Sequence, residues 1–471
     1  MKKEWVNGRT LGVVVSLAFF SFVFLGTEYL FDNMMSYVTD ADGVVIAQGY
    51  ILGISVIGFL LFPVLNRFLK QQVMDIVMFV FGVVGPICIF VVQQHESYAS
   101  ILAAGGIVFV QLGVLGSYIH YLAAVAFGQS RHLAKIVGTA YALGIFLQFL
   151  NNNLIDNHLT ESVILSLGLA MLVFACGKIN KDLTISDKAQ GEEEKKRCPF
   201  KKPAVAGITL LVIVALMTCI FASLDNAVTL VHAAGSVDIG QWPRLLLAVS
   251  GFAAGILFDI KNRRYMNMIM YSITLLSTAC VVVIELGGPF LAGLIVFYLS
   301  AGFFVVYFTT VFMDLAGYMK VPAFWAGIGR ATNNLFAVIT SIPSVALLVS
   351  WNDLVLIVTA LVLFVLISIA IFIYSGQIKL SEQLDEAILR NGQETDQEKF
   401  ENFSEAFSLN PREKEILKIL LSSDENVQDI ADKLFLSRAA LYRYLSSLNE
   451  KTETKSRIGL LQFYYAWKKS D

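Results

Sequence analysis

The stretch "KINKDLTISDKAQGEEEKKRCPFKKP", residues 178–203, is the only long charged segment that precedes the polar C-terminal part of the chain. Apolar runs flank it on both sides, each close to the roughly 20 residues that a helix needs to cross a bilayer. Six runs precede the stretch and six follow it, near residues 10–31, 44–65, 73–93, 101–127, 136–155, 162–177, 204–224, 242–259, 266–286, 290–313, 326–350 and 354–374. The pattern predicts an all-α membrane region of two six-helix bundles, residues 1–177 and 204–378, joined by a cytoplasmic loop.

Composition points to the same class of protein. The chain has 471 residues, of which 56% are hydrophobic and 15% are charged, which excludes an ordinary soluble domain. Its five cysteines lack paired or metal-ligand spacing, so we expect neither disulfides nor a zinc site. Since no phosphate-binding loop or nucleophile–base pair is found, we expect no enzyme, metal or cofactor.

The distribution of charge predicts the orientation in the membrane. Lys and Arg concentrate in the N-terminus and the even-numbered connections, for example Arg67 and Lys70. The odd-numbered connections hold no Lys or Arg and carry acids instead, such as Asp32 and Asp40. Because positive residues stay on the cytoplasmic side, we predict a multi-pass protein of the cytoplasmic membrane, in contact with lipids and with both termini in the cytoplasm.

Ionisable side chains inside the spans are candidates for function, because burying them in a bilayer is costly. Of the 35 basic residues only two, Arg244 and Arg330, fall inside spans. In the predicted orientation one set lies in or near the outer halves, where it can line a cavity for an unknown small-molecule ligand: Glu28, Gln148, Asn152, Asp225, Trp242 and Arg244. A second set lies in the inner halves and can form a gate or an interhelical network: His120, Arg330, Asn333 and Asn334.

Two interpretations of these side chains stay open. Arg244, a cation beside Trp242 on a side without other cations, can bind an anionic or aromatic ligand. The alternative is that each polar residue forms an interhelical hydrogen bond or an interfacial charge, as is common in membrane bundles.

A loop motif follows the eighth span. The sequence "GILFDIKNRRY", residues 255–265, contains Gly255, Asp259, Arg263 and Arg264, and it resembles the loop motif of the major facilitator superfamily. The glycine permits close helix packing, and the arginines can pair with the aspartate or with lipid phosphates. The resemblance implies a six-plus-six transporter fold over residues 1 to about 378. A second copy, expected between the second and third spans, has Phe62 in place of the acid.

The C-terminal part has a different pattern. Residues 379–405 are polar and acidic and are interpreted as a linker, and residues 406–471 carry short amphipathic helices. Asn410 and Pro411 predict the start of the first helix, and Ser437 caps the third. The very short turn before Ser437 is typical of helix-turn-helix units.

Residues 409–459, "LNPREKEILKILLSSDENVQDIADKLFLSRAALYRYLSSLNEKTETKSRIG", resemble the LuxR-type (NarL/FixJ-like) DNA-binding domain. The resemblance implies contacts with double-stranded DNA at Tyr442, Arg443 and Ser446 and a capping hydroxyl at Ser437. Helical periodicity adds Ser447, and Arg438 is a further basic candidate. A homodimer on DNA, and contact with RNA polymerase, are the partners that the resemblance suggests. The other interpretation is a protein-interaction module.

Together the two resemblances predict a membrane-embedded transcriptional regulator that senses a small molecule through a transporter-like domain. The alternative is a facilitator-type transporter with a regulatory helix-turn-helix tail. Solute accumulation in vesicles would favour the transporter, whereas binding without flux would favour the sensor.

Overall fold

The computed structural model describes residues 8–128, 130–155, 157–187, 202–233, 235, 242–349, 353–422 and 426–467. These residues form helices and turns, and no strand occurs within the described ranges. The chain divides into two compact units, Met1–Ile378 and Lys379–Asp471.

The first unit consists of two sets of six helices. The first set is α1 (Gly8–Met35), α2 (Ala41–Phe68), α3 (Gln71–Gln94), α4 (Tyr98–Phe127), α5 (Leu133–Leu154) and α6 (His158–Asp187). The second set is α7 (Pro203–Ala233), α8 (Trp242–Phe258), α9 (Met266–Glu285), α10 (Phe290–Ala316), α11 (Pro322–Val349) and α12 (Asp353–Ala406).

Length and hydropathy make this a multi-pass membrane protein. Within the described part of the chain, ten helices are long and apolar enough to cross a bilayer. The other two of the twelve are α8, a shorter apolar helix of 17 residues, and α11. Most of the predicted loop 178–203 lies outside the described residues, and residues 178–187 continue α6.

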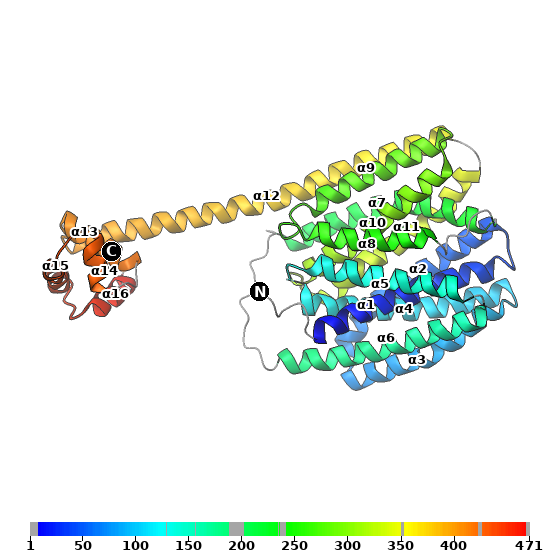
Figure 1. Ribbon diagram of the computed structural model, residues 1–471, viewed down its shortest axis with the longest axis horizontal. Helices are drawn as coiled ribbons and strands as arrows, with labels where there is room; N and C mark the ends of the chain where they lie inside the picture. Colours follow the sequence, from blue (N-terminus) through cyan, green and yellow to red (C-terminus); the bar gives the residue numbers. More distant parts are fainter. Residues whose placement is uncertain are drawn as a thin grey trace. The chain divides into compact units, whose positions relative to one another are not determined.

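Peripheral helices present an apolar surface. Figure 1 shows α3 and α6 along one edge of the bundle, and α9 and α12 along the opposite edge. Phe79, Phe174 and Phe372, on α3, α6 and α12, are 70%, 75% and 80% exposed. Such side chains are stable where lipid replaces water around the bundle.

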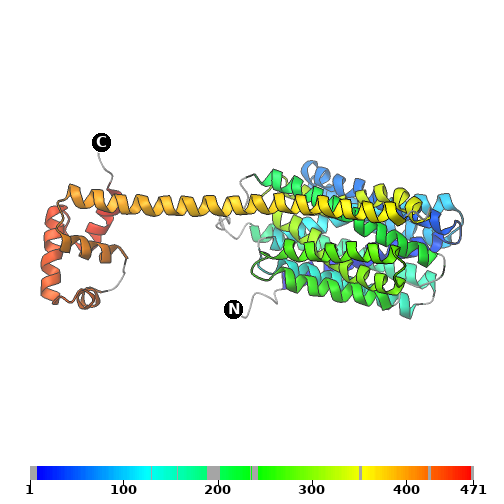
Figure 2. The same cartoon turned by 90° about the horizontal axis from the view of Figure 1, so that it is seen from above.

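The largest contacts between the two six-helix sets are those of α2 with α11 and of α5 with α8. Figure 2 shows the helices of this unit running in one general direction. Glycine allows the α5–α8 contact: a Cβ atom on Gly255 would lie 2.7 Å from the carbonyl oxygen of Ala134, and one on Gly138 would lie 2.7 Å from the Cα of Gly255. The backbones therefore approach as closely as small residues permit.

Helix α12 differs from its predicted extent. The apolar run ends near Tyr374, but the helix runs from Asp353 to Ala406, so the segment predicted as a linker is helical. Hydropathy marks where a helix leaves the apolar phase and not where its hydrogen bonds end, which is the reason for the difference.

The second unit contains the end of α12 and four short helices, α13 (Pro411–Ser422), α14 (Val427–Lys433), α15 (Arg438–Lys451) and α16 (Arg457–Ala466). Leu441, Leu445 and Leu448 of α15 are buried, as their i, i+4, i+7 spacing predicts. Phe403 at the end of α12 is also fully buried, against the ring of Tyr464 at 5.0 Å. The unit thus has its own hydrophobic core.

Candidate functional site

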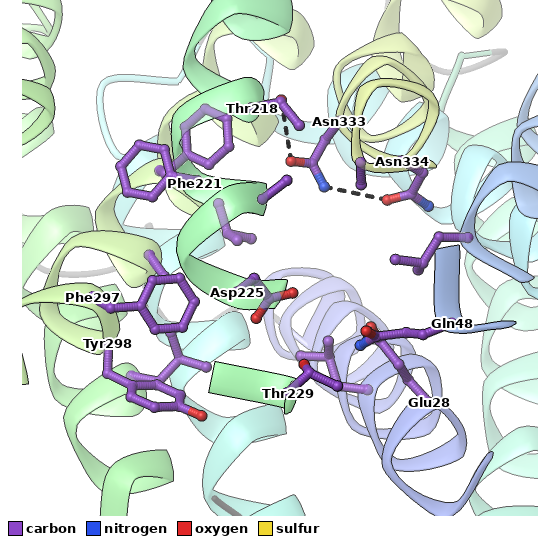
Figure 3. A pocket seen from close by; sticks show the side chains of 18 of the residues that line it. Glu28, Gln48, Thr218, Phe221, Asp225, Thr229, Phe297, Tyr298, Asn333 and Asn334 are labelled. Atoms are coloured by element: carbon purple, nitrogen blue, oxygen red, sulfur yellow. Dashed lines mark hydrogen bonds between the residues drawn. The ribbon is translucent and has the colours of Figure 1, made fainter. Parts of the chain in front are cut away.

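A cavity of about 140 Å³ lies between the two six-helix sets. Its walls come from α1, α2 and α5 on one side and from α7, α8, α10 and α11 on the other. Figure 3 shows side chains of α1, α2, α7, α10 and α11 around a common space. A cavity between packed bundles that is lined by polar groups is a usual place for a ligand site.

Five ionisable side chains line this cavity. The acids are Glu28 and Asp32 of α1 and Asp225 of α7, and the cations are Arg244 of α8 and Arg330 of α11. Gln48 of α2 holds Glu28 in place by donating a hydrogen bond of 2.9 Å from Nε2 to Oε1. The cavity therefore holds three carboxyl groups and two guanidinium groups inside a largely apolar helix bundle.

Arg330 is more buried than Arg244, with 9% of its surface exposed. Its guanidinium carbon lies 4.7 Å from the ring centre of Phe24 and 5.9 Å from that of Phe308, and such cation–π contacts stabilise a desolvated cation. Arg330 also lines a second cavity of about 30 Å³, which His120 borders. The imidazole Nδ1 of His120 lies 2.6 Å from the carbonyl oxygen of Gly116.

A chain of amide side chains crosses the cavity between the two helix sets. Thr218 donates to Oδ1 of Asn333 at 3.4 Å, and Nδ2 of Asn333 donates to Oδ1 of Asn334 at 3.3 Å. Nδ2 of Asn334 then donates to Oγ of Ser55 on α2 at 2.8 Å. Figure 3 shows the first two of these bonds. The network links α7, α11 and α2 beside the charged groups.

One wall of the cavity is aromatic. The rings of Phe221 and Phe304 are stacked, with centroids 4.5 Å apart and an interplanar angle of 8°. Phe297 and Tyr298 continue this wall along α10. The wall offers apolar surface to a solute beside the charged groups.

The structure brings together members of both predicted sets. Glu28, Asp225 and Arg244 line the main cavity together with Arg330, Asn333 and Asn334. The remaining predicted ligand residues do not line it. Gln148 is fully buried and donates to the carbonyl oxygen of Leu25 at 2.8 Å, Asn152 is half-buried on α5, and Trp242 is 41% exposed at the start of α8.

One detail of the sequence analysis needs correction. Asp32, expected in an outer loop, lies inside α1 and is 6% exposed, because α1 extends past the end of the apolar run to Met35. Arg244 has an aromatic neighbour that is distant in sequence: the ring centre of Tyr29 lies 5.9 Å from its guanidinium carbon. Gln48 lies inside the apolar run 44–65 and carries the same polar signal as Gln148, whereas nothing in the sequence distinguishes Phe221 and Phe304 from ordinary packing residues.

The loop motif joins the two helix sets at the end of α8. The Asp259 carboxylate accepts hydrogen bonds from the backbone N–H groups of Ala134 at 3.1 Å and Lys135 at 2.9 Å, in the first turn of α5. Arg263 donates to the carbonyl oxygen of Ser130 at 2.7 Å and forms two bonds of 3.1 Å with Asp314. A carboxylate at a helix N-terminus is also favoured by the helix dipole.

The remaining motif residues have other surroundings. Gly255 provides the close α5–α8 approach, whereas Arg264 is exposed.

The residues predicted to contact DNA lie on or next to α15. Ser437 caps the helix by accepting a hydrogen bond of 3.2 Å from the backbone of Ala440. The Arg438 guanidinium lies 5.8 Å from the ring centre of Tyr442. Ser447 is half-buried, whereas the other five predicted residues are exposed: Ser437, Arg438, Tyr442, Arg443 and Ser446.

Comparison with solved structures finds transporters. The chain is similar to the human organic anion transporter MFSD10 (TETRAN), with 14% identity, a TM-score of 0.49 and coverage of 78% of this chain and 97% of that one. It is also similar to the E. coli fucose:proton symporter FucP, with 13% identity, a TM-score of 0.47 and coverage of 77% of this chain and 97% of that one. A third similar structure is an auto-inhibited peptide transporter of the POT family, with 14% identity, a TM-score of 0.48 and coverage of 80% of this chain and 97% of that one. No family model and no curated protein matches the chain.

These findings correct the main functional prediction. A membrane-embedded transcriptional regulator was predicted, but the similar structures are transporters. None of the comparisons supports the LuxR resemblance of residues 409–459.

Proposed function

We propose that this protein is a transporter that moves a small polar solute through the central cavity by alternating exposure to the two sides of the membrane. One observation carries the proposal: helices of both six-helix sets line a central cavity that contains five ionisable side chains. Charged side chains within membrane spans typically mark the pathway of a substrate or ion. A site between two helix sets becomes accessible from either side when the sets rock against each other.

The contacts of the loop motif support this proposal. Asp259 and Arg263 bond across the two helix sets to the first turn of α5 and to Ser130. A typical hydrogen bond contributes about 0.5–1.5 kcal/mol net. A few such bonds favour the observed arrangement but still allow another one, as a transporter requires.

We propose that the end of α8 with this motif faces the cytoplasm, and with it both chain termini, because the basic connections lie on that side. A reporter enzyme that is active only in the cytoplasm, fused after the last residue, tests the orientation. Activity of an export-dependent reporter at the same position would refute it.

The tail is proposed to regulate transport or the expression of the transporter. Contacts of its six candidate residues with double-stranded DNA, a homodimer on DNA and an interaction with RNA polymerase stay predictions. Genome-wide DNA occupancy of the intact chain and its Arg443→Ala variant tests the DNA contact. Identical occupancy of both chains would exclude it.

Flux through the purified protein in sealed vesicles tests the transport proposal. The panel of labelled solutes contains amino acids, sugars including fucose, small peptides and organic anions. We expect saturable uptake of one class, and its loss in Asp225→Asn and Arg330→Gln, because both side chains line the cavity. Saturable binding of a solute without any flux would contradict the proposal.

A further inference from the structure

The central cavity presents both signs of charge to one small volume. Glu28, Asp32 and Asp225 supply carboxyl groups, and Arg244 and Arg330 supply guanidinium groups. Among the described residues, no salt bridge within 4.0 Å joins any of these acids to either arginine. The opposite charges therefore face the same space without neutralising each other directly.

Several polar atoms at the site lack partners. Within the described ranges, Nε of Arg244, Nε of Arg330 and Oδ1 of Asp32 are buried without a hydrogen bond. Buried charged groups are costly unless they are paired and hydrogen-bonded. A solute with only one sign of charge would pair with either the carboxyl groups or the guanidinium groups and would leave the others unpaired.

Arg330 and the asparagine pair lie on α11, whereas the three acids lie on α1 and α7. Arg330, Asn333 and Asn334 share one face of α11, because residues three and four apart are neighbours on a helix. Thr218, which bonds to Asn333, and Asp225 are seven residues apart on α7, which corresponds to about 10 Å along a helix axis. Figure 3 accordingly shows the asparagine pair at one end of the cavity and Glu28 and Thr229 at the other.

Cavity size and the aromatic wall restrict the solute further. At roughly 10–15 Å³ for each water, a cavity of 140 Å³ holds about ten water molecules. This space is comparable to that of a small amino acid. The stacked rings of Phe221 and Phe304 offer apolar surface between the two charged ends.

We propose that the cavity binds a small zwitterion, with its carboxylate near Arg330 and the asparagine pair and its ammonium group near Glu28 and Asp225. The substrate class is thus an amino acid or a close analogue with an apolar substituent on the aromatic wall. This inference rests on the proposed transport function, because it assigns a solute to the same cavity. No covalent step is involved.

Binding of matched ligands to the purified full-length protein tests this inference. Glycine, leucine and phenylalanine are each compared with their own amide, which carries only the positive charge, and their own N-acetyl form, which carries only the negative charge. We expect at least one amino acid to bind about tenfold or more tightly than both of its derivatives, as is typical when a buried charge loses its partner. If none of the three binds more tightly than its derivatives, the inference is overturned.

Two variants assign the ends of the site. Arg330→Gln should weaken binding of the N-acetyl form more than binding of the amide. Glu28→Gln should weaken binding of the amide more than binding of the N-acetyl form. The ratio of the two affinities is measured within a single folded sample of each variant, so it does not depend on how stable the variant is. Equal effects on both derivatives would overturn the assignment. The control is Lys70→Gln, an exposed position outside the cavity, which should leave all affinities unchanged.

The same samples separate this inference from the transport proposal. Zwitterion binding with no flux in vesicles would contradict transport and leave the zwitterion site intact. Flux of an uncharged sugar, without discrimination among the matched ligands, would support transport and overturn the zwitterion site.

Discussion

At the scale of single residues, Asn334 joins the two helix sets inside the membrane unit. It is 1% exposed, donates to Ser55 of α2 and accepts from Asn333 on its own helix. Interhelical hydrogen bonds of this kind contribute about 1 kcal/mol. The side chain therefore contributes to stability as well as to the cavity wall.

Asn334→Ala should destabilise the membrane unit by about 1 kcal/mol, because the Ser55 bond is lost and Asn333 loses its acceptor. The measurement is reversible unfolding in detergent, with Asn66→Ala, an exposed asparagine on α2, as the control. An unfolding midpoint equal to that of the control would contradict the role assigned to Asn334.

The candidate site could be predicted from the sequence only in part. Glu28, Asp225 and Arg244 were predicted because a charge inside an apolar run is conspicuous. Phe221 and Phe304 were not predicted, since a phenylalanine facing a cavity has the same sequence pattern as one facing lipid. Which polar residues meet depends on the packing of helices distant in sequence, and hydropathy contains no information about that packing.

At the scale of elements, the α5–α8 contact depends on glycine. A side chain at Gly255 would meet the backbone of Ala134 at 2.7 Å. Backbone atoms cannot move aside as a flexible side chain can, so the two helices must separate. Overpacking of this kind typically costs about 1–3 kcal/mol.

Gly255→Leu should therefore favour the arrangement in which the two helix sets are separated at this end, and should lower the initial rate of solute uptake by about tenfold. Gly177→Leu on α6 is the control, since nothing lies within 4 Å of a Cβ at Gly177. Equal uptake rates for both variants would show that close α5–α8 packing is not needed for transport.

Glu413 organises the first helix of the tail. Its side chain is 1% exposed and accepts hydrogen bonds from the backbone of Asn410 at 2.8 Å, from Ser447 at 2.7 Å and from Lys451 at 2.6 Å. Burial raises the pKa of this carboxyl group, but the bonds from Lys451, Asn410 and Ser447 outweigh it and hold the pKa below the ordinary 4.5.

The lowered pKa gives the tail a pH-dependent stability. A carboxyl group with a lower pKa in the folded state contributes stability that is present above its unfolded pKa and is lost as the pH falls through the folded pKa. The unfolding midpoint of residues 399–471 should thus fall as the pH decreases below about 4.5. The Glu413→Gln variant should be less stable at neutral pH, and its unfolding midpoint should decrease less as the pH falls. Parallel pH profiles for the two proteins would contradict this assignment.

The elements themselves were largely predictable. Apolar runs predicted the twelve helices of the first unit, of which ten are long and apolar enough to cross a bilayer within the described residues. The Asn410 cap with Pro411 marked the start of α13. The continuation of α12 to Ala406 was missed, because polar residues form helices as well as apolar ones do. The burial of Glu413 was also missed, since its Lys451 partner lies 38 residues away.

At the scale of the whole molecule, the membrane unit holds the candidate site. Two six-helix sets enclose a charged cavity, and the contacts of Asp259 and Arg263 join the sets at the end of α8. We propose that the cavity opens to each side of the membrane in turn. Such alternating access is expected whichever solute enters the cavity.

Accessibility of a cysteine inside the cavity tests the claim directly. Ala222 lines the cavity and is small, so Ala222→Cys, in a chain whose five native cysteines are replaced by serine or alanine, introduces a thiol with little disturbance. Phe372→Cys, on the exposed apolar surface of α12, is the control and should not react with a charged, membrane-impermeant thiol reagent.

The reagent is applied separately to right-side-out and inside-out membrane vesicles that contain the Ala222→Cys protein. We expect the cysteine to be labelled in both kinds of vesicle, because alternating exposure brings the cavity to each side. Labelling from one side only, under conditions where the control stays unlabelled, would contradict the account.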